Sequence, residues 1–236
     1  MSDETDMSEE RNWLYQERAR VTIANLQKRN ITAQYVSTRQ EALSTILGMI
    51  PEGATVACGD SVTLDQVGVI AELVKRNQNT VLNPMGRNAD GSATVSGEQR
   101  LKMQREAFSS DVFLTGTNAI TLDGKLVNTD ALGNRVAPMI FGPTKVIVVV
   151  GANKIVKDGN EAIERIRQVA APMNAKRHYL KHHMEAFGNL PCARTGVCVD
   201  CNNDSRICRN TVIIEGSFGQ RKERLNVVLV GEALGI

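Results

Sequence analysis

Two short apolar runs, each leading to a glycine, constrain the fold of this chain more than any other feature. Val112–Leu114 leads into Gly116–Asn118, and Val146–Val150 leads into Gly151–Lys154. Runs rich in β-branched residues that stop at glycine and small polar residues are typical of buried strands that open onto loops. In open α/β sheets, ligands bind at the carboxyl ends of such strands. We therefore expect a ligand pocket lined by residues 116–118, 128–135 and 151–154.

Strand and helix patterns alternate along the rest of the chain. Ala54–Cys58 is expected to form a buried strand, and Leu64, Val67 and Ile70 follow it at helical spacing. Asp123-Gly124 separates the two arms of a predicted hairpin. This alternation predicts an α/β fold with a mainly parallel sheet flanked by helices. Helices are also expected after an N-cap at Thr38 and over residues 8–29, 98–109, 158–169 and 173–187, with Pro172 ending the helix over 158–169. Further strands are expected over residues 31–36, 80–83, 211–215 and 226–230. A charged turn joins the last two strands.

Composition argues against several classes of function. A net charge of +2 and an aromatic content of 4% do not suit a surface that binds nucleic acid. No apolar run reaches the roughly 18–20 residues that span a bilayer, and the acidic start MSDETDMSEE is unlike a signal peptide. We therefore expect a cytoplasmic protein that binds neither nucleic acid nor a membrane. Residues 1–12 are expected to be flexible, and residues 13–236 to form one domain.

Four of the five cysteines gather in one polar stretch, expected to be an irregular loop over residues 188–210. They are Cys192, Cys198, Cys201 and Cys208, spaced C-x5-C-x2-C-x6-C. Four thiolates suit tetrahedral zinc or an iron–sulfur cluster. Zinc sites usually carry two C-x2-C pairs, and this loop has one, which favours [4Fe–4S] over zinc. A loop of free thiols without metal is the remaining alternative.

Polar residues at the expected strand ends are candidates for binding and catalysis. A strand, small residues and then a helix can direct backbone N–H groups at an anion, although most such turns bind nothing. Asp130 could act as a general base and Arg135 as an anion clamp, unless the two form a structural ion pair. Lys154 could reach the same pocket. The candidate catalytic residues are thus Asp130, Arg135 and Lys154, and the candidate substrate-binding residues are Gly59, Asp60, Ser61, Gly116, Thr117, Asn118, Asn128 and Asn134.

Several other polar residues are interpreted more simply. His178, His182 and Glu185 share one side of a helix, a geometry a metal could use, but no HExxH or HxxEH pattern accompanies them. Arg87 and Arg105 could meet an acidic ligand. Exposed polar side chains are the rule on helices and loops, so we expect all five to be solvated.

A longer pattern adds a family resemblance. The run GTNAITLDGKLVNTDALGNRVAPMIFGPTKVIVVVGANKIV, followed by a helix and PCARTGVC, resembles the lactate-utilisation (LUD-domain) proteins, in the branch with a C-terminal four-cysteine loop. The resemblance extends over the chain from about Trp13. It implies a Rossmann-like sheet similar to ribose-5-phosphate isomerase, glucosamine-6-phosphate deaminase and the CoA transferases, with a pocket at the strand ends. Some family members belong to systems that oxidise L-lactate to pyruvate with iron–sulfur partner proteins.

Three functions are compatible with these features. The leading hypothesis is an enzyme or enzyme subunit of organic-acid (lactate-like) metabolism that binds a small anionic metabolite, carries an iron–sulfur cluster and meets a redox partner protein. The second is a sugar-phosphate isomerase-like or acyl-processing enzyme with structural zinc, although the GTNAI segment lacks the glutamate that CoA transferases use as nucleophile. The third is a non-catalytic metabolite-binding subunit of a redox complex. A homodimer is possible, with the N-terminal helix as a candidate interface.

Overall fold

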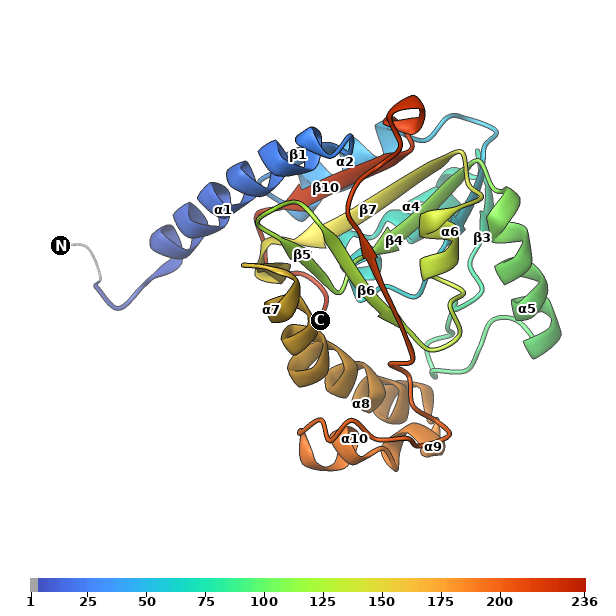
Figure 1. Cartoon of the computed structure of the whole chain (residues 1–236). Helices are drawn as coiled ribbons and strands as arrows, with labels where there is room; N and C mark the ends of the chain where they lie inside the picture. Colours follow the sequence, from blue (N-terminus) through green and yellow to red (C-terminus); the bar gives the residue numbers. More distant parts are fainter. Residues whose placement is uncertain (1–3) are drawn as a thin grey trace.

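The runs of β-branched residues form the middle of a six-stranded sheet (Figure 1). The computed structural model describes residues 4–236. Every neighbouring pair of strands in this sheet is parallel, which confirms the α/β class and the mainly parallel sheet. The strand order is β1 (Thr32–Val36), β10 (Leu225–Val230), β7 (Lys145–Gly151), β4 (Val112–Gly116), β2 (Thr55–Cys58) and β3 (Thr80–Leu82).

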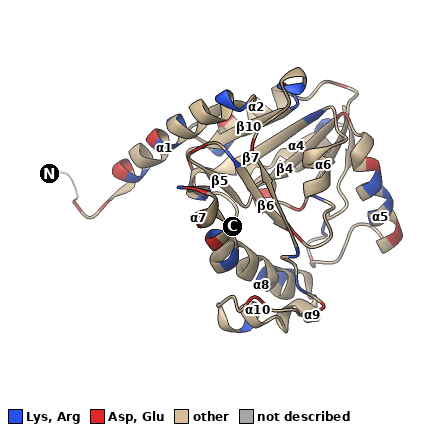
Figure 2. Cartoon of the chain, in the orientation of Figure 1, with Lys and Arg blue, Asp and Glu red and all other residues tan. Residues whose placement is uncertain are grey.

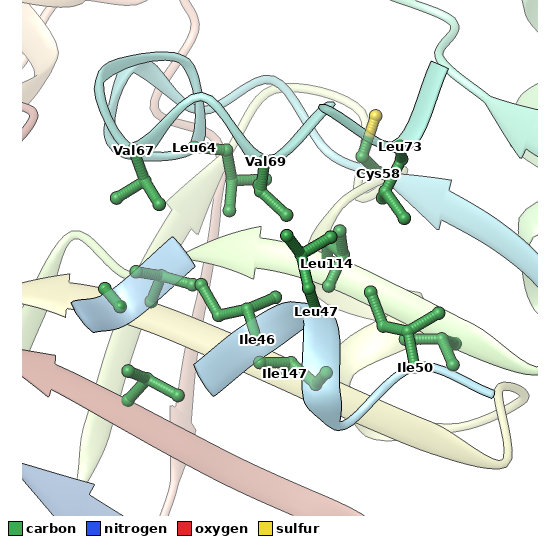
Figure 3. Close-up of a cluster of buried hydrophobic side chains, with 14 of the residues drawn as sticks. Ile46, Leu47, Ile50, Cys58, Leu64, Val67, Val69, Leu73, Leu114 and Ile147 are labelled. Carbon is green, nitrogen blue, oxygen red and sulfur yellow. The ribbon is translucent and has the colours of Figure 1, made fainter. Parts of the chain in front are cut away.

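Alternate residues of each strand serve two separate cores. Ile147 and Val149 of β7 face α2 (Arg39–Gly48), α3 (Val62–Val67) and α4 (Val69–Arg76), whose apolar side chains complete the cluster drawn in Figure 3. Val146, Val148 and Val150 belong to the other cluster, which includes residues of α1 (Ser8–Lys28). This period of two is the pleat of a strand buried on both faces, so both sides of the sheet must be covered.

A second, four-stranded sheet lies against the first. It contains β8 (Ile155–Val156), β5 (Ala119–Thr121), β6 (Leu126–Asp130) and β9 (Asn210–Ile214), in that order. The antiparallel pairing of β5 with β6 confirms the hairpin at Asp123-Gly124. The last two strands were predicted to be joined by a charged turn. In the structure, β9 pairs with β6, whereas β10 belongs to the parallel sheet. The turn, which includes η4 (Gly219–Arg221), therefore crosses between sheets.

The helices in the first half of the chain lie close to their predicted positions, with several differences in detail. Thr38 caps α2 as expected, its hydroxyl accepting from the Glu41 backbone N–H. Helix α1 (Ser8–Lys28) matches the helix predicted over residues 8–29, and it includes residues 8–12, which were also assigned to a flexible terminus; residues 1–3 of that terminus lie outside the described part of the chain. The helix expected after β2 is two helices, because Gly68 adopts a left-handed conformation (φ +80°) between α3 and α4. Elsewhere α5 (Gly97–Glu106) runs into η1 (Ala107–Ser109), and α6 (Val136–Ile140) was not predicted.

Pro172 does not end its helix, contrary to the sequence prediction. Helix α7 (Gly159–Arg165) widens into a π-helical segment, η3 (Ile166–Ala170), and continues as α8 (Ala171–His182). Pro172 lies in the first turn of α8, where the missing N–H is tolerated beside the widened turn. The result is one long arm that carries α8 to α9 (Glu185–Gly188) and α10 (Pro191–Thr195) at one end of the molecule (Figure 1). Among the described residues, no helix is long and apolar enough to cross a membrane.

Candidate functional site

A cavity of about 300 Å³ opens at the carboxyl ends of β2, β4 and β7. These strands are neighbours in the sheet, so the loops that follow them meet, as the sequence predicted from their glycines. The volume is at the lower end of the range for small-molecule sites, which is roughly 300–1,000 Å³. Nine of the predicted site residues line the cavity: Asp60, Ser61, Gly116, Thr117, Asn118, Asp130, Asn134, Arg135 and Lys154.

Lys154 contributes a buried amine to this cavity. It ends the short helix η2 (Ala152–Lys154) after β7, and its side chain is 4% exposed. Its Nζ donates to the Thr63 hydroxyl at 3.1 Å and to the Thr117 carbonyl at 3.3 Å. Burial, reinforced by the positive charges of Arg165 and Arg135, lowers the pKa of Lys154 to about 7. An amine with this pKa exchanges protons readily at neutral pH.

Arg135 braces the loops around the cavity. Its Nη1 donates to Asn128 Oδ1 at 2.7 Å and to the Gly116 carbonyl at 3.4 Å, and its Nη2 donates to Asn118 Oδ1 and to the Thr129 carbonyl, both at 3.0 Å. These four bonds use the terminal N–H groups that an anion clamp would need. Burial lowers the pKa of Arg135, against the opposing effects of Asp130 and Asp60, but a guanidinium stays charged at neutral pH. Arg135 therefore offers a ligand its charge more than its hydrogen bonds.

Three other predicted residues support the site in ways the sequence did not indicate. Asp130 makes no side-chain ion pair with Arg135; its Oδ2 accepts from the backbone N–H groups of Arg135 (2.9 Å) and Val136 (3.2 Å) at the start of α6. Gly59 is absent from the lining, because the stem of Arg135 packs on it and an added Cβ would lie 2.9 Å from Arg135 Cγ. Asn128 is also absent from the lining and instead accepts from Arg135.

Two more predicted residues, Ser61 and Gly116, meet each other at the cavity wall. The Ser61 hydroxyl caps α3 by accepting from the Leu64 N–H at 3.4 Å. A Cβ at Gly116 would lie 2.7 Å from Ser61 Oγ, so a larger residue at this position would displace the hydroxyl that caps α3. The Gly59–Ser61 turn thus has the structural role that most strand–helix turns have, and its polar contribution to the cavity comes from Asp60.

Asp60 is the centre of a group of polar side chains whose contacts the sequence did not predict. Arg177 Nη2 donates to both carboxylate oxygens, at 2.6 and 2.8 Å, and His178 Nε2 lies 3.6 Å from Asp60 Oδ2. Burial disfavours the charged carboxylate, but Arg177 outweighs it and keeps the pKa of Asp60 below its usual value. His178 in turn has its Nδ1 2.9 Å from His182 Nδ1, and burial lowers the pKa of His178 to about 4. The two histidines expected to be solvated are therefore part of the cavity wall or its support.

The chain is similar to known proteins in sequence and in fold. The family model of the LUD domain matches residues 19–230. The chain belongs to the LUD domain family. Among solved structures it is similar to a DUF162 family protein from Deinococcus radiodurans, with 15% identity and a TM-score of 0.49 over 93% of this chain and 98% of that one. It is also similar to ribose 5-phosphate isomerase from Plasmodium falciparum (13% identity, TM-score 0.30, 57% of this chain and 66% of that one). No curated protein matches.

The LUD domain carries its cysteine loop next to the cavity. Cys192, Cys198, Cys201 and Cys208 are free thiols, each partly buried. Burial raises the pKa of Cys192, and the nearby Cys208, Cys201 and Cys198 raise it further. Within residues 4–236, however, no three His, Cys, Asp or Glu side chains are grouped as a metal-binding site. The donor set suits a soft metal centre, while the loop's arrangement is not that of a coordination sphere.

The cysteine loop and the cavity share a wall in this LUD domain. Ile207 of the loop packs with Phe187, Cys192 and Cys201 around Leu190, and both Ile207 and Phe187 line the cavity. The Phe187 ring lies 5.3 Å from that of His178. Arg206 holds the loop closed by donating to the Cys201 and Cys208 carbonyls at 2.6 and 3.0 Å. The two predicted sites are therefore neighbours.

Proposed function

We propose that this LUD domain protein acts in organic-acid metabolism and binds a small 2-hydroxy or 2-oxo acid, of the lactate and pyruvate type, in the cavity at the strand ends. The observation that carries the proposal is Lys154: a buried amine at the cavity, held by two neutral oxygens, with no carboxylate within ion-pair distance among the described residues. A buried cation without a counterion attracts an anionic ligand.

Each side chain at this end of the cavity has a role in the proposal. The charges of Arg135 and Lys154 attract the ligand's carboxylate. With its pKa near 7, Lys154 can accept the hydroxyl proton of a 2-hydroxy acid while the hydrogen on carbon 2 leaves as hydride to a redox partner, and in the reverse direction the partner returns the hydride and Lys154 the proton. Asn118 fixes Arg135, because its Oδ1 accepts from Arg135 Nη2 and from the Thr129 N–H. The ligand therefore meets a charge that is already oriented.

Binding of L-lactate and pyruvate to the full chain, measured by isothermal titration calorimetry, tests the proposal. We expect both acids to bind, and Lys154→Met to weaken them by about tenfold or more, since a charge-assisted hydrogen bond is lost. Lys157→Met is the matched control, because Lys157 is exposed and only three residues away. If neither acid binds, or if the Lys154→Met and Lys157→Met variants bind them with equal affinity, the proposed acid site at Lys154 is wrong.

For the cysteine loop we propose a [4Fe–4S] cluster held by Cys192, Cys198, Cys201 and Cys208, with zinc as the alternative. The support is the four neighbouring thiols on one loop and the chemistry of thiolate donors. The cluster, when bound, would supply one-electron redox chemistry. Anaerobic purification followed by iron, sulfide and zinc analysis tests this. About four irons per chain, lost in Cys198→Ser and kept in Cys58→Ser, supports the cluster; one zinc supports the alternative, and neither metal contradicts both.

A further inference from the structure

A group of arginines lines the cavity away from Lys154. Arg87 comes from the loop after β3, Arg100 from α5 and Arg177 from α8, and all three line the same cavity. Basic residues recur along both helices on the ribbon (Figure 2). Sequence patterns gave no sign that these three segments meet. Three guanidiniums at one cavity, with Asp60 as their neighbouring carboxylate, form a second positively charged region of the site.

Two of these arginines lack acceptors for buried N–H groups. Arg177 is satisfied by Asp60. Arg87, by contrast, makes one long bond, from Nη1 to the Gly91 carbonyl at 3.5 Å. Arg87 Nε, Arg87 Nη2 and Arg100 Nε are buried without a hydrogen-bond partner within the described part of the chain. Buried guanidinium N–H groups are almost always paired, so three nitrogens without acceptors beside a cavity indicate acceptors that come from a ligand.

The arginine group and Lys154 reach the cavity from different strands. Arg87 follows β3 and Lys154 follows β7, and β2 and β4 lie between these two strands in the sheet. Burial lowers the pKa of Arg87, and the charges of Arg100 and Arg177 lower it further, against the opposing effect of Asp60. The cations that act on Lys154 are a different set, Arg165 and Arg135. Arg87 and the amine therefore enter the cavity from opposite sides of β2 and β4. A single ligand with two anionic or polar ends can contact both.

We propose that Arg87, Arg100 and Arg177 form a phosphoryl-binding subsite, so that the natural ligand is a phosphorylated hydroxy or oxo acid with its phosphate at this end. The inference rests on the proposed function, because the acid end of the ligand is the one assigned to Lys154. A tetrahedral phosphate presents three oxygens, one for each of the three unpaired guanidinium nitrogens, which come from two side chains. A second carboxylate has two oxygens in one plane, which a single arginine can already saturate.

Calorimetry with glycerate, 3-phosphoglycerate and inorganic phosphate tests the subsite on the full chain. We expect 3-phosphoglycerate to bind about tenfold or more tightly than glycerate, and inorganic phosphate to compete with it. Arg87→Gln and Arg100→Gln should each weaken 3-phosphoglycerate and inorganic phosphate about tenfold and leave glycerate unchanged. Arg105→Gln, an exposed arginine on the same helix as Arg100, is the control.

The outcomes separate this inference from the proposed function. Equal affinities for glycerate and 3-phosphoglycerate, or an equal loss of both in Arg87→Gln, would overturn the subsite and leave the lactate-type site standing. If glycerate does not bind but inorganic phosphate does, and Arg87→Gln abolishes that binding, the subsite stands and the assignment of the Lys154 end fails. Far-UV circular dichroism of each variant confirms that a loss of affinity is not a loss of fold.

Discussion

Replacing Lys154 with methionine should make the protein more stable at neutral pH. The pKa of Lys154 is about 7, against an ordinary value of 10.5. This depression of about 3.5 pH units corresponds to about 5 kcal/mol, at about 1.36 kcal/mol per unit. Below pH 7 the folded protein bears the whole of this cost, because the ammonium is charged in both the folded and the unfolded chain and is buried in the folded one.

The sign of the pH dependence follows from proton binding. Between about pH 7 and pH 10.5 the unfolded chain holds a proton on this amine that the folded protein has released, so the free energy of unfolding rises with pH. From pH 7 to about pH 9.5, Lys154 accounts for a rise of about 3 kcal/mol. Methionine keeps the apolar stem but leaves the Thr117 carbonyl without its donor, at a cost of about 1–3 kcal/mol. The net gain at pH 7 is then about 1–3 kcal/mol.

Urea unfolding followed by circular dichroism, from about pH 6 to about pH 9.5, measures both effects. The quantity of interest is the difference in unfolding free energy between wild type and Lys154→Met at each pH, since other titrating groups cancel in it. Lys157→Met should give a difference near zero throughout, because that side chain is exposed. A difference for Lys154→Met that does not change with pH would refute the depressed pKa, and with it the proton-transfer role proposed for the amine.

Two further substitutions test other parts of the structure. Asp60→Asn should lower the unfolding free energy by about 3 kcal/mol, because it leaves the buried Arg177 without its carboxylate. Asp65→Asn is the control. Burial and the charge of Asp60 raise the pKa of Asp65, so removing the Asp65 charge should not lower the unfolding free energy. Equal losses of calorimetric stability in Asp60→Asn and Asp65→Asn would exclude a special contribution from the Asp60–Arg177 pair. Trp13→Glu tests the homodimer. Trp13 is 63% exposed and lies in the first half of α1. The N-terminal end of this helix projects from the sheets (Figure 1). We expect the variant to be monomeric in light scattering if α1 is the interface, and an unchanged mass would argue against it.

The central sheet could be predicted because its signal is local. Val146–Val150 has its pattern in five consecutive residues, and the glycines that follow the strands mark where they end. The pairing of β6 with β9 could not be predicted, since it joins residues 126–130 to residues 210–214 and no local pattern records a partner so far along the chain. The helix end predicted at Pro172 was wrong for a related reason: a π-helical turn before this residue removes the usual steric conflict, and that turn has no sequence signature.

The position of the site could be predicted from the sequence, but the hydrogen-bond partners of its side chains could not. Glycine and asparagine at the strand ends located the cavity, yet the partners of Arg135 depend on how Asn118 and Asn128 are oriented across the hairpin. Arg177 was missed entirely. A polar residue on a long helix looks solvated in sequence, and its pairing with Asp60 exists because α8 returns to the end of β2.

The arm formed by α7, η3 and α8 also explains why the two predicted centres adjoin. It starts beside β8, passes the cavity with Arg177 and His178, and delivers the chain to α9, α10 and the cysteine loop. Ile207 then returns to the cavity wall and packs with Phe187, whose ring contacts His178. A rearrangement of the four thiols into a tighter group must therefore move Ile207 or Phe187, because packed side chains transmit displacements. Cysteine variants should for this reason be assayed for ligand affinity as well as for metal content.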